Sequence, residues 1–387
     1  MLFRSVGTGP TVDGKTLNLQ ANARLQAGLD SSWNGPVKLY GKAVLDVPAN
    51  VVLELGGVLS GVGGFTKTGS GELLLSGLNN NTYTGQTCVD DGQLSLSKVG
   101  LFTNAISISG PLIIGETSDI KSPRTVLYAN ETIAPNVSVA VNRNGLLNLA
   151  NHIQTIHTLK INSGIADSGI LGVIHLGSIL TSTNELGHNG QILGWLDLGN
   201  APRTFQVSNG AGWLDIYARI TGGTAATLQK VGDGRVTFLG SNLYEGLTQI
   251  SEGWIEVDHP MGLGSPVNGT VVSDWGALYL SSLQWIENSM TITNETLTLA
   301  PLSNDFDHYN GCFASFGTNI WKGVITLGSY VIVRAEEKTD QLILSTRIQG
   351  SFGLTKTGKG QLIGLLFRSN NDIAPQSDNP QIGRAHV

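Results

Sequence analysis

The feature that most constrains this chain is an internal repeat. The segment at 63–96, GGFTKTGSGELLLSGLNNNTYTGQTCVDDGQLSL, returns in altered form at 228–257 and, shortened, at 353–362. With flanking residues, we place the three copies at 63–97, 226–258 and 353–364. The residues that recur at matching positions are Lys67, Gly69, Gly71, Tyr83, Gly85 and Gly92, then Lys230, Gly232, Gly234, Tyr244, Gly246 and Gly253, then Lys356, Gly358 and Gly360. A repeat of this size indicates stacked turns, as in a solenoid.

Apolar and variable residues alternate within each copy. Leu73 and Leu75 are replaced by other apolar residues in the second copy, whereas Leu74 between them becomes Thr237. This period of two predicts three short strands per copy, joined by Gly and Asn turns, and they can bury an apolar face only by stacking on the next turn. The sequence therefore predicts an all-β fold, a parallel β-helix. Its expected core face is Leu73, Leu75, Val89, Leu94, Leu96, Val236, Phe238, Ile250, Ile255 and Val257, and its outer face carries Leu74, Cys88, Thr237 and Gln249.

The order of the motifs resembles a known repeat. Lys-Thr-Gly-x-Gly, an apolar strand, Asn-x-Tyr-x-Gly-x-Thr-x-Val and Gly-x-Leu together resemble the autotransporter-associated β-strand repeat of bacterial passenger domains, and the resemblance extends over about 33–362. It implies a right-handed parallel β-helix, or β-solenoid, outside the cell or on the outer-membrane surface of a Gram-negative-type bacterium. It also implies that the repeats act in secretion and display, and that the export signal and the outer-membrane barrel lie outside these residues.

Composition agrees with a stacked architecture. Gly accounts for 51 of the 387 residues, and charged residues for 13%, against a typical share of ~25%. We expect one continuous solenoid over 6–364, with roughly 15 turns in place of several globular domains. A net charge of -6 argues against a nucleic-acid partner, because phosphate contacts require gathered Lys and Arg. No apolar run approaches the ~20 residues of a membrane-spanning helix.

Both ends of the chain look unrelated to the repeat. Residues 1–5 and 382–387 match the translation of a common sequencing adapter, and Leu-Phe-Arg-Ser from 2–5 recurs at 366–369. We therefore expect 1–5 and 365–387 to be artefactual, and 365–387 to add no regular strand. Because the flanking turns would then be cut, their strand edges favour end-to-end self-association.

Several residues of chemical interest have a plain structural interpretation. Two cysteines are too few for a disulfide framework, and the Gly-Asp-Gly at 232–234 lacks the iterated motif of calcium-binding β-rolls. Two histidines five residues apart would point to opposite faces of a regular strand. We expect no catalytic, cofactor or metal site at Cys88, Cys312, His152, His157, Asp305, Asp307 or His308.

An enzyme is the main alternative function. Parallel β-helices also include polysaccharide lyases and glycoside hydrolases, which need carboxylates converging from adjacent turns. The candidate sets are Asp46, Glu54 and Glu72, or Glu252, Glu256 and Asp258. A phage tail or another β-helical fibre is a further alternative. We favour a non-catalytic, adhesin-like passenger with a host-surface, matrix or polysaccharide ligand.

Two further segments carry weaker patterns. The residues around Trp33, Gly35 and Val37 resemble those around Trp321, Gly323 and Val324, so a larger unit recurs before a Lys-Thr-Gly signature. The segment 17–29 has a weak helical pattern, which its Asn and Gly residues oppose.

Overall fold

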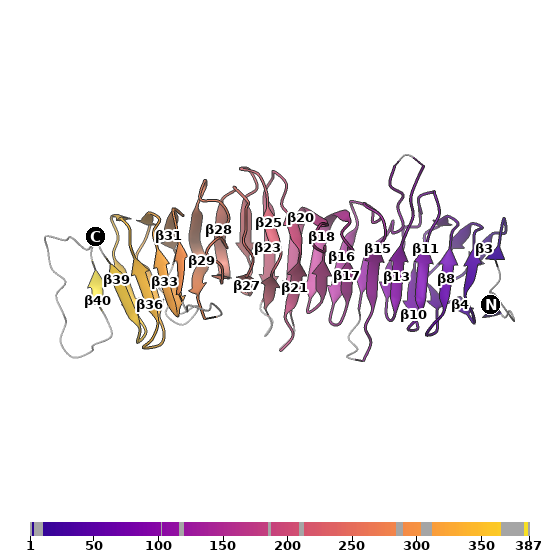
Figure 1. Ribbon diagram of the computed structural model, residues 1–387, viewed down its shortest axis with the longest axis horizontal. Helices are drawn as coiled ribbons and strands as arrows, with labels where there is room; N and C mark the ends of the chain where they lie inside the picture. Colours follow the sequence, from indigo (N-terminus) through magenta and orange to yellow (C-terminus); the bar gives the residue numbers. More distant parts are fainter. Residues whose placement is uncertain are drawn as a thin grey trace. The chain divides into compact units, whose positions relative to one another are not determined.

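The computed structural model describes residues 2–3, 11–101, 103–115, 120–184, 187–208, 213–283, 289–302, 312–364 and 383–385. Every regular element within these ranges is a β-strand. The chain divides into two compact units, Met1–Asp197 and Leu198–Val387, and Figure 1 shows the strands of each stacked side by side. Each unit is a parallel β-solenoid, which confirms the predicted fold class.

The strands of the first unit follow one another at short intervals. They are β1 (Leu2–Phe3), β2 (Thr11–Val12), β3 (Leu17–Leu19), β4 (Arg24–Ala27), β5 (Ser31–Trp33), β6 (Val37–Leu39), β7 (Ala43–Asp46), β8 (Val52–Leu55), β9 (Leu59–Ser60), β10 (Phe65–Thr68), β11 (Glu72–Leu75), β12 (Thr87–Val89), β13 (Gln93–Leu96), β14 (Leu112–Ile114), β15 (Arg124–Leu127), β16 (Ser138–Asn142), β17 (Leu146–Asn148), β18 (Ile153–Asn162), β19 (Ile165–Asp167), β20 (Val173–Thr183), β21 (Gly190–Leu193) and β22 (Trp195–Asp197).

The second unit is built in the same way. Its strands are β23 (Arg203–Ser208), β24 (Leu214–Ile216), β25 (Arg219–Thr221), β26 (Leu228–Val231), β27 (Arg235–Phe238), β28 (Thr248–Val257), β29 (Thr270–Ser281), β30 (Ser289–Ile292), β31 (Leu297–Pro301), β32 (Phe313–Phe316), β33 (Thr318–Trp321), β34 (Ile325–Leu327), β35 (Val331–Ala335), β36 (Gln341–Leu344), β37 (Ile348–Gly350), β38 (Leu354–Thr357), β39 (Gln361–Gly364) and β40 (Gly383–Ala385).

Within the solenoid, most strands pair with the strand one turn earlier and the strand one turn later. In the first unit, one column runs β4–β7–β10–β12–β14–β16 and a second runs β5–β8–β11–β13–β15–β17, all parallel. The strands β3–β6–β9 form a third side. Because the pairing is in register, equivalent side chains of successive turns lie directly above one another.

The second unit shows that the third repeat copy is displaced within the solenoid. Strand β26, which carries Lys230, stacks in the column β23–β26–β28. Strand β38, which carries Lys356, instead stacks in the column β27–β28–β29–β32–β35–β38. The third copy therefore begins one side further around the turn than the second copy.

The core lies inside the turns, and the predicted inward residues form it. All ten residues of the predicted core face are at most 1% exposed. Leu74 and Gln249, which lie between them in the strands, are half-buried. The period-two register is therefore confirmed on the core side.

Three local predictions are corrected. The segment 17–29 forms strands β3 and β4, separated by Asn22 at a φ of 62°. Trp33 and Trp321 are both buried, but the residue matching Val37 is the buried Ile325, since Val324 is exposed. The expectation of no regular strand in 365–387 is wrong for β40, which pairs antiparallel with β38. The recurring Leu-Phe-Arg-Ser at 366–369 lies outside the described residues.

Candidate functional site: the buried lysine boxes

The repeat lysine occupies a core position. Lys67 pairs with Leu45 in the preceding turn and with Val89 in the following turn, so it interrupts a column of apolar side chains. Its side chain is fully buried. A lysine in such a place needs acceptors for its N–H groups, because an unpaired buried charge is very costly.

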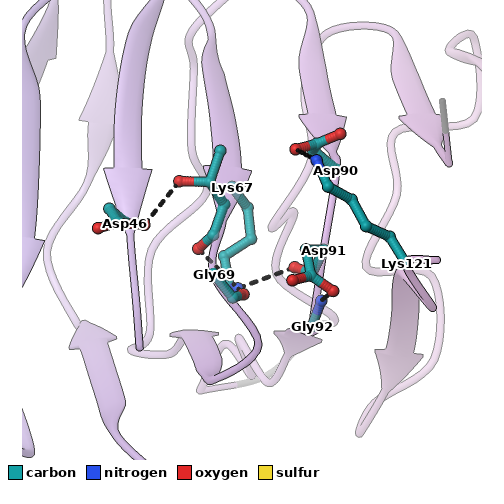
Figure 2. A network of polar contacts seen from close by, with 8 residues as sticks. Asp46, Lys67, Gly69, Asp90, Asp91, Gly92 and Lys121 are labelled. Carbon is teal, nitrogen blue, oxygen red and sulfur yellow. Dashed lines mark hydrogen bonds and ion pairs between the residues drawn. The ribbon is translucent and has the colours of Figure 1, made fainter. Parts of the chain in front are cut away.

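Backbone carbonyl groups provide those acceptors. Lys67 Nζ donates to the carbonyl oxygens of Thr68 at 3.1 Å, Gly69 at 2.5 Å and Asp91 at 2.9 Å (Figure 2). The first two carbonyls belong to the last residue of β10 and to the turn that follows it, whereas Asp91 belongs to the next coil of the solenoid. We call this lysine with its three carbonyls a lysine box. The hydrogen bonds of the box connect one turn of the solenoid to the next.

The second copy builds the same box. Lys230 Nζ donates to the carbonyls of Val231 at 3.2 Å, Gly232 at 2.5 Å and Glu252 at 2.9 Å, and its side chain is also fully buried. In the third copy, Lys356 donates to the carbonyl of Gly358 and is half-buried. The complete box therefore requires a following turn with a matching carbonyl.

The boxes alter the electrostatics of their lysines. Burial lowers the pKa of Lys67 to about 8, although the carboxylates of Asp91, Asp46 and Asp90 oppose this shift. Burial also lowers the pKa of Lys230 to about 7, against the opposing charges of Glu252 and Asp233. Three acceptors match the three donors of an ammonium group, so the box compensates the charge that burial disfavours.

The same corner contains ion pairs on its outer side. Asp46 pairs with Arg24 at 2.7 Å and accepts a hydrogen bond from Thr68 Oγ1 at 2.9 Å, while Asp90 pairs with Lys121 (Figure 2). Hydrogen bonding to Arg24 and Thr68 outweighs burial and lowers the pKa of Asp46. These contacts also join successive turns.

The repeat glycines are required by close stacking. A Cβ on Gly253 would lie 2.4 Å from the carbonyl oxygen of Gly232 and 2.5 Å from that of Gly234. In the first copy, a Cβ on Gly92 would lie 2.5 Å from the carbonyl oxygen of Gly71. The backbones of adjacent turns therefore leave no room for a side chain at this position.

This contact predicts the effect of Gly253→Ala. We expect a loss of about 1–3 kcal/mol from overpacking, in addition to the cost of a positive φ. Gly199→Ala is the matched control, because Gly199 has a φ of 67°, close to the 64° of Gly253, but nearby has only the end of the Arg203 side chain. Urea denaturation of both variants measures the difference. Equal losses of stability in the two variants would show that the positive φ, and not the close backbone contact at Gly253, sets the cost.

The sequence did not reveal the partners of two polar side chains in each copy, a tyrosine and an asparagine. The buried Tyr83 hydroxyl lies 2.6 Å from Thr87 Oγ1, and Tyr244 lies 2.6 Å from Thr248 Oγ1. Asn81 accepts from the Leu59 N–H at 2.9 Å in the preceding turn and donates to the Ser107 carbonyl at 2.7 Å in the following one.

The second copy repeats the asparagine bridge. Asn242 accepts from the Ile220 N–H at 2.9 Å and donates to the Gly262 carbonyl at 2.6 Å. The signal for these roles was present in the recurring Asn-x-Tyr-x-Gly-x-Thr order. In both copies, the recurring asparagine connects successive turns, whereas the tyrosine bonds to a threonine four residues later in the same turn.

Comparison with known proteins agrees with this repeat geometry. The family model described as Passenger-associated-transport-repeat matches residues 65–96 and 228–257. The chain therefore carries two copies of a repeat found in autotransporter passengers. Over 101 residues it is 34% identical to the Adhesin BmaC autotransporter of Brucella suis biovar 1 (strain 1330), a match that covers 26% of this chain and 3% of that protein. No solved structure matches the chain.

The first set of candidate catalytic carboxylates is engaged in turn-to-turn contacts. Glu54 accepts hydrogen bonds from Ser32 at 2.9 Å and Ser76 at 2.6 Å, and Glu72 accepts one from Ser95 at 2.5 Å. Asp46 lies in a different column, β4–β7–β10, from Glu54 and Glu72. The structure therefore does not bring this set together.

The second set of candidate catalytic carboxylates is divided between two places in the structure. Glu252 accepts a hydrogen bond from the Gly232 N–H at 2.9 Å, within the corner of the lysine box. Glu256 pairs with Arg235 at 2.8 Å, and the charges of Asp258 and Asp215 help to raise its pKa. Sequence analysis missed Asp215, which comes from a strand two turns before Glu256.

The raised pKa of Glu256 predicts that the stability of the fold depends on pH. Burial, together with Asp258 and Asp215, raises its pKa from 4.5 to about 7 although Arg235 opposes the shift. The folded state thus binds a proton that the unfolded state releases, so stability should fall as pH rises from about 4.5 to about 7. Thermal melts over that range should show a smaller slope for Glu256→Gln. Part of the pH dependence of the melting temperature should persist in Glu256→Gln, because burial also raises the pKa of Glu295 to about 7.

Two outward residues are more buried than expected. Cys88 and Thr237, which were predicted to lie on the outer face, are each only 2% exposed. Lys42 Nζ lies 3.5 Å from the Cys88 sulfur, and Arg235 Nε donates to Thr237 Oγ1 at 3.2 Å. Long neighbouring side chains cover these short ones on the outer face.

The cysteine and histidine residues singled out from the sequence have surroundings of different kinds. Cys312 is buried and, like Cys88, is a free thiol. His157 lies at a register shift in β18, so the strand is not regular there, and His152 precedes it next to Asn130 Oδ1 at 3.2 Å. Asp305, Asp307 and His308 lie outside the described residues.

In the part of the chain that the structure describes, no three His, Cys, Asp or Glu side chains are grouped so that they could hold a metal ion. The described residues also contain no helix that is long and apolar enough to cross a membrane.

Proposed function

We propose that this chain is a structural, non-enzymatic part of a passenger displayed outside the cell or on the outer-membrane surface, with an adhesin-like role. The observation that carries the proposal is the use of the recurring residues. In both full passenger repeats, Lys and Asn form hydrogen bonds to neighbouring turns of a parallel β-solenoid, and Gly permits the close approach of their backbones. Such a repeat makes a rigid spacer, whose outer faces are free to vary.

The carboxylates of the first unit support a non-enzymatic role. Glu54 and Glu72 each bond to serine hydroxyls of adjacent turns, and Asp46 is held by an arginine. The oxygen atoms of these carboxylates therefore accept hydrogen bonds from neighbouring turns. The adhesin-like role rests on the similarity to the BmaC protein, which is itself described as an adhesin.

Surface display can be tested on cells that produce the full-length gene product. Intact cells are treated with a protease that cannot cross the outer membrane, and fragments are detected with antibodies against this chain. We expect cleavage in intact cells. Protection in intact cells, followed by degradation after lysis, would contradict surface display.

A further inference from the structure

One outer side of the second unit carries a ladder of uncharged side chains. The strands β26, β28, β29, β31, β34 and β37 are paired in parallel, and one outward residue of each lies in register with that of the next. We call these residues the amide-hydroxyl ladder: Gln229, Gln249, Val271, Thr298, Thr326 and Gln349. All of them are half-buried. None carries a charge, although the net charge of the protein is -6.

The polar groups of the ladder retain capacity for hydrogen bonds to a ligand. The side-chain amides of Gln229 and Gln249 make no hydrogen bond to another described residue. Gln349 Nε2 donates to Thr326 Oγ1 at 3.0 Å, which leaves the second N–H and the carbonyl oxygen of that amide. The positions two residues further along the chain are small: Ser273, Ala300 and Gly328. No long side chain therefore covers the ladder from these positions.

An apolar ridge borders the ladder. Leu302, Tyr330 and Phe352 follow β31, β34 and β37, so three successive turns each place one apolar side chain at the same corner. These side chains are 74%, 56% and 38% exposed. The rings of Tyr330 and Phe352 meet edge to face, with their centroids 5.7 Å apart. Apolar side chains that are exposed together mark interaction sites, whereas single ones are ordinary.

The ladder and its backbone narrow the class of ligand. A nucleic acid or another charged polymer needs charges of opposite sign, which the ladder does not offer. A peptide that adds a strand needs a free sheet edge, but β28, β29, β31 and β34 each have a partner on both sides. An uncharged polymer with both apolar and hydroxyl-bearing surface fits the ridge and the ladder.

A neutral polysaccharide has both kinds of surface. The C–H groups of a pyranose ring form an apolar face that stacks on an aromatic side chain, and its hydroxyl groups pair with amide and hydroxyl side chains. From β26 to β37 the ladder extends over roughly 24 Å at the spacing of paired strands, so an extended sugar chain can contact both the ladder and the ridge. We propose that they bind an uncharged, β-linked polysaccharide, an inference that rests on the proposed surface display.

The test uses the full chain and two uncharged probes, cellohexaose and the hexamer of β-1,4-linked N-acetylglucosamine. Calorimetric titration should show binding of at least one hexamer, and weaker binding of the matching disaccharide, which cannot span the ladder and the ridge. Tyr330→Ala and Phe352→Ala should each weaken binding about tenfold, because each removes a stacking surface. Gln249→Ala should weaken it about fivefold through the lost amide.

Tyr40→Ala is the matched control in the first unit. Tyr40 is 52% exposed, close to the 56% of Tyr330, so the two substitutions remove similar exposed rings. The control should leave binding unchanged. Thermal melts establish that each variant is folded.

Three results would overturn the inference. These are no binding of either hexamer, binding that the ridge substitutions leave unchanged, and self-association of the chain that Tyr330→Ala abolishes while neither sugar binds. The last result, measured by light scattering, would identify the ridge as a contact between copies of this chain. The protease assay on cells needs neither the sugars nor these variants, so failure of the sugar inference leaves surface display standing.

Discussion

Replacing Phe238 by Asp should unfold or severely destabilise the second unit. Phe238 is fully buried in β27, in register with Val257, so the new carboxylate would lie within the core. The lost aromatic packing and the buried charge should together cost at least about 4 kcal/mol. Urea denaturation followed by circular dichroism measures this loss. Leu75→Asp should have the same effect in the first unit, where Leu75 is fully buried.

The control for this prediction is Gln249→Asp. Gln249 is half-buried between Gln229 and Val271 on the outward side, so its replacement should change stability by less than about 0.5 kcal/mol. Thr237→Asp is expected to lie between the two. An outer-face position alone would make this substitution nearly neutral, but Thr237 pairs with Asp215 and Glu256, so a third carboxylate would meet two others. Equal stability of Phe238→Asp and Gln249→Asp would show that the register is wrong.

The second large effect concerns the lysine box. Lys230→Met keeps the length of the apolar stem but removes the donor from three carbonyl oxygens, those of Val231, Gly232 and Glu252. Each buried acceptor left without a partner costs about 1–3 kcal/mol, so we expect a loss of about 3 kcal/mol or more. Denaturant unfolding gives the loss, and hydrogen exchange near Gly253 should report loosening of the next turn.

Lys356→Met is the matched control within the same unit. Lys356 is half-buried and donates to the Gly358 carbonyl, so its replacement should cost less than about 0.5 kcal/mol. A variant Lys230→Met with unchanged stability would mean that the hydrogen bonds of the box only offset the cost of burying an amine. The box would then not fasten successive turns.

The order of residues along the chain determined the secondary structure and the core face of this protein. Alternation is a local property, since each strand side chain points to the side opposite its neighbours. Leu73 and Leu75 could therefore be assigned to the core without knowledge of any other turn. The same glycines that mark the repeat in the sequence also mark where adjacent backbones come closest.

Tertiary structure decided what the polar residues do, because their partners lie one turn away. Lys67 occupies a core position only because the Asp91 carbonyl, 24 residues later, completes its box. Cys88 is covered by Lys42, which is 46 residues earlier in the chain. Asp215 approaches Glu256 only through stacking of β24, β27 and β28. A periodic pattern specifies which side of a strand is apolar, whereas the stacking of turns specifies which distant residues share the other side.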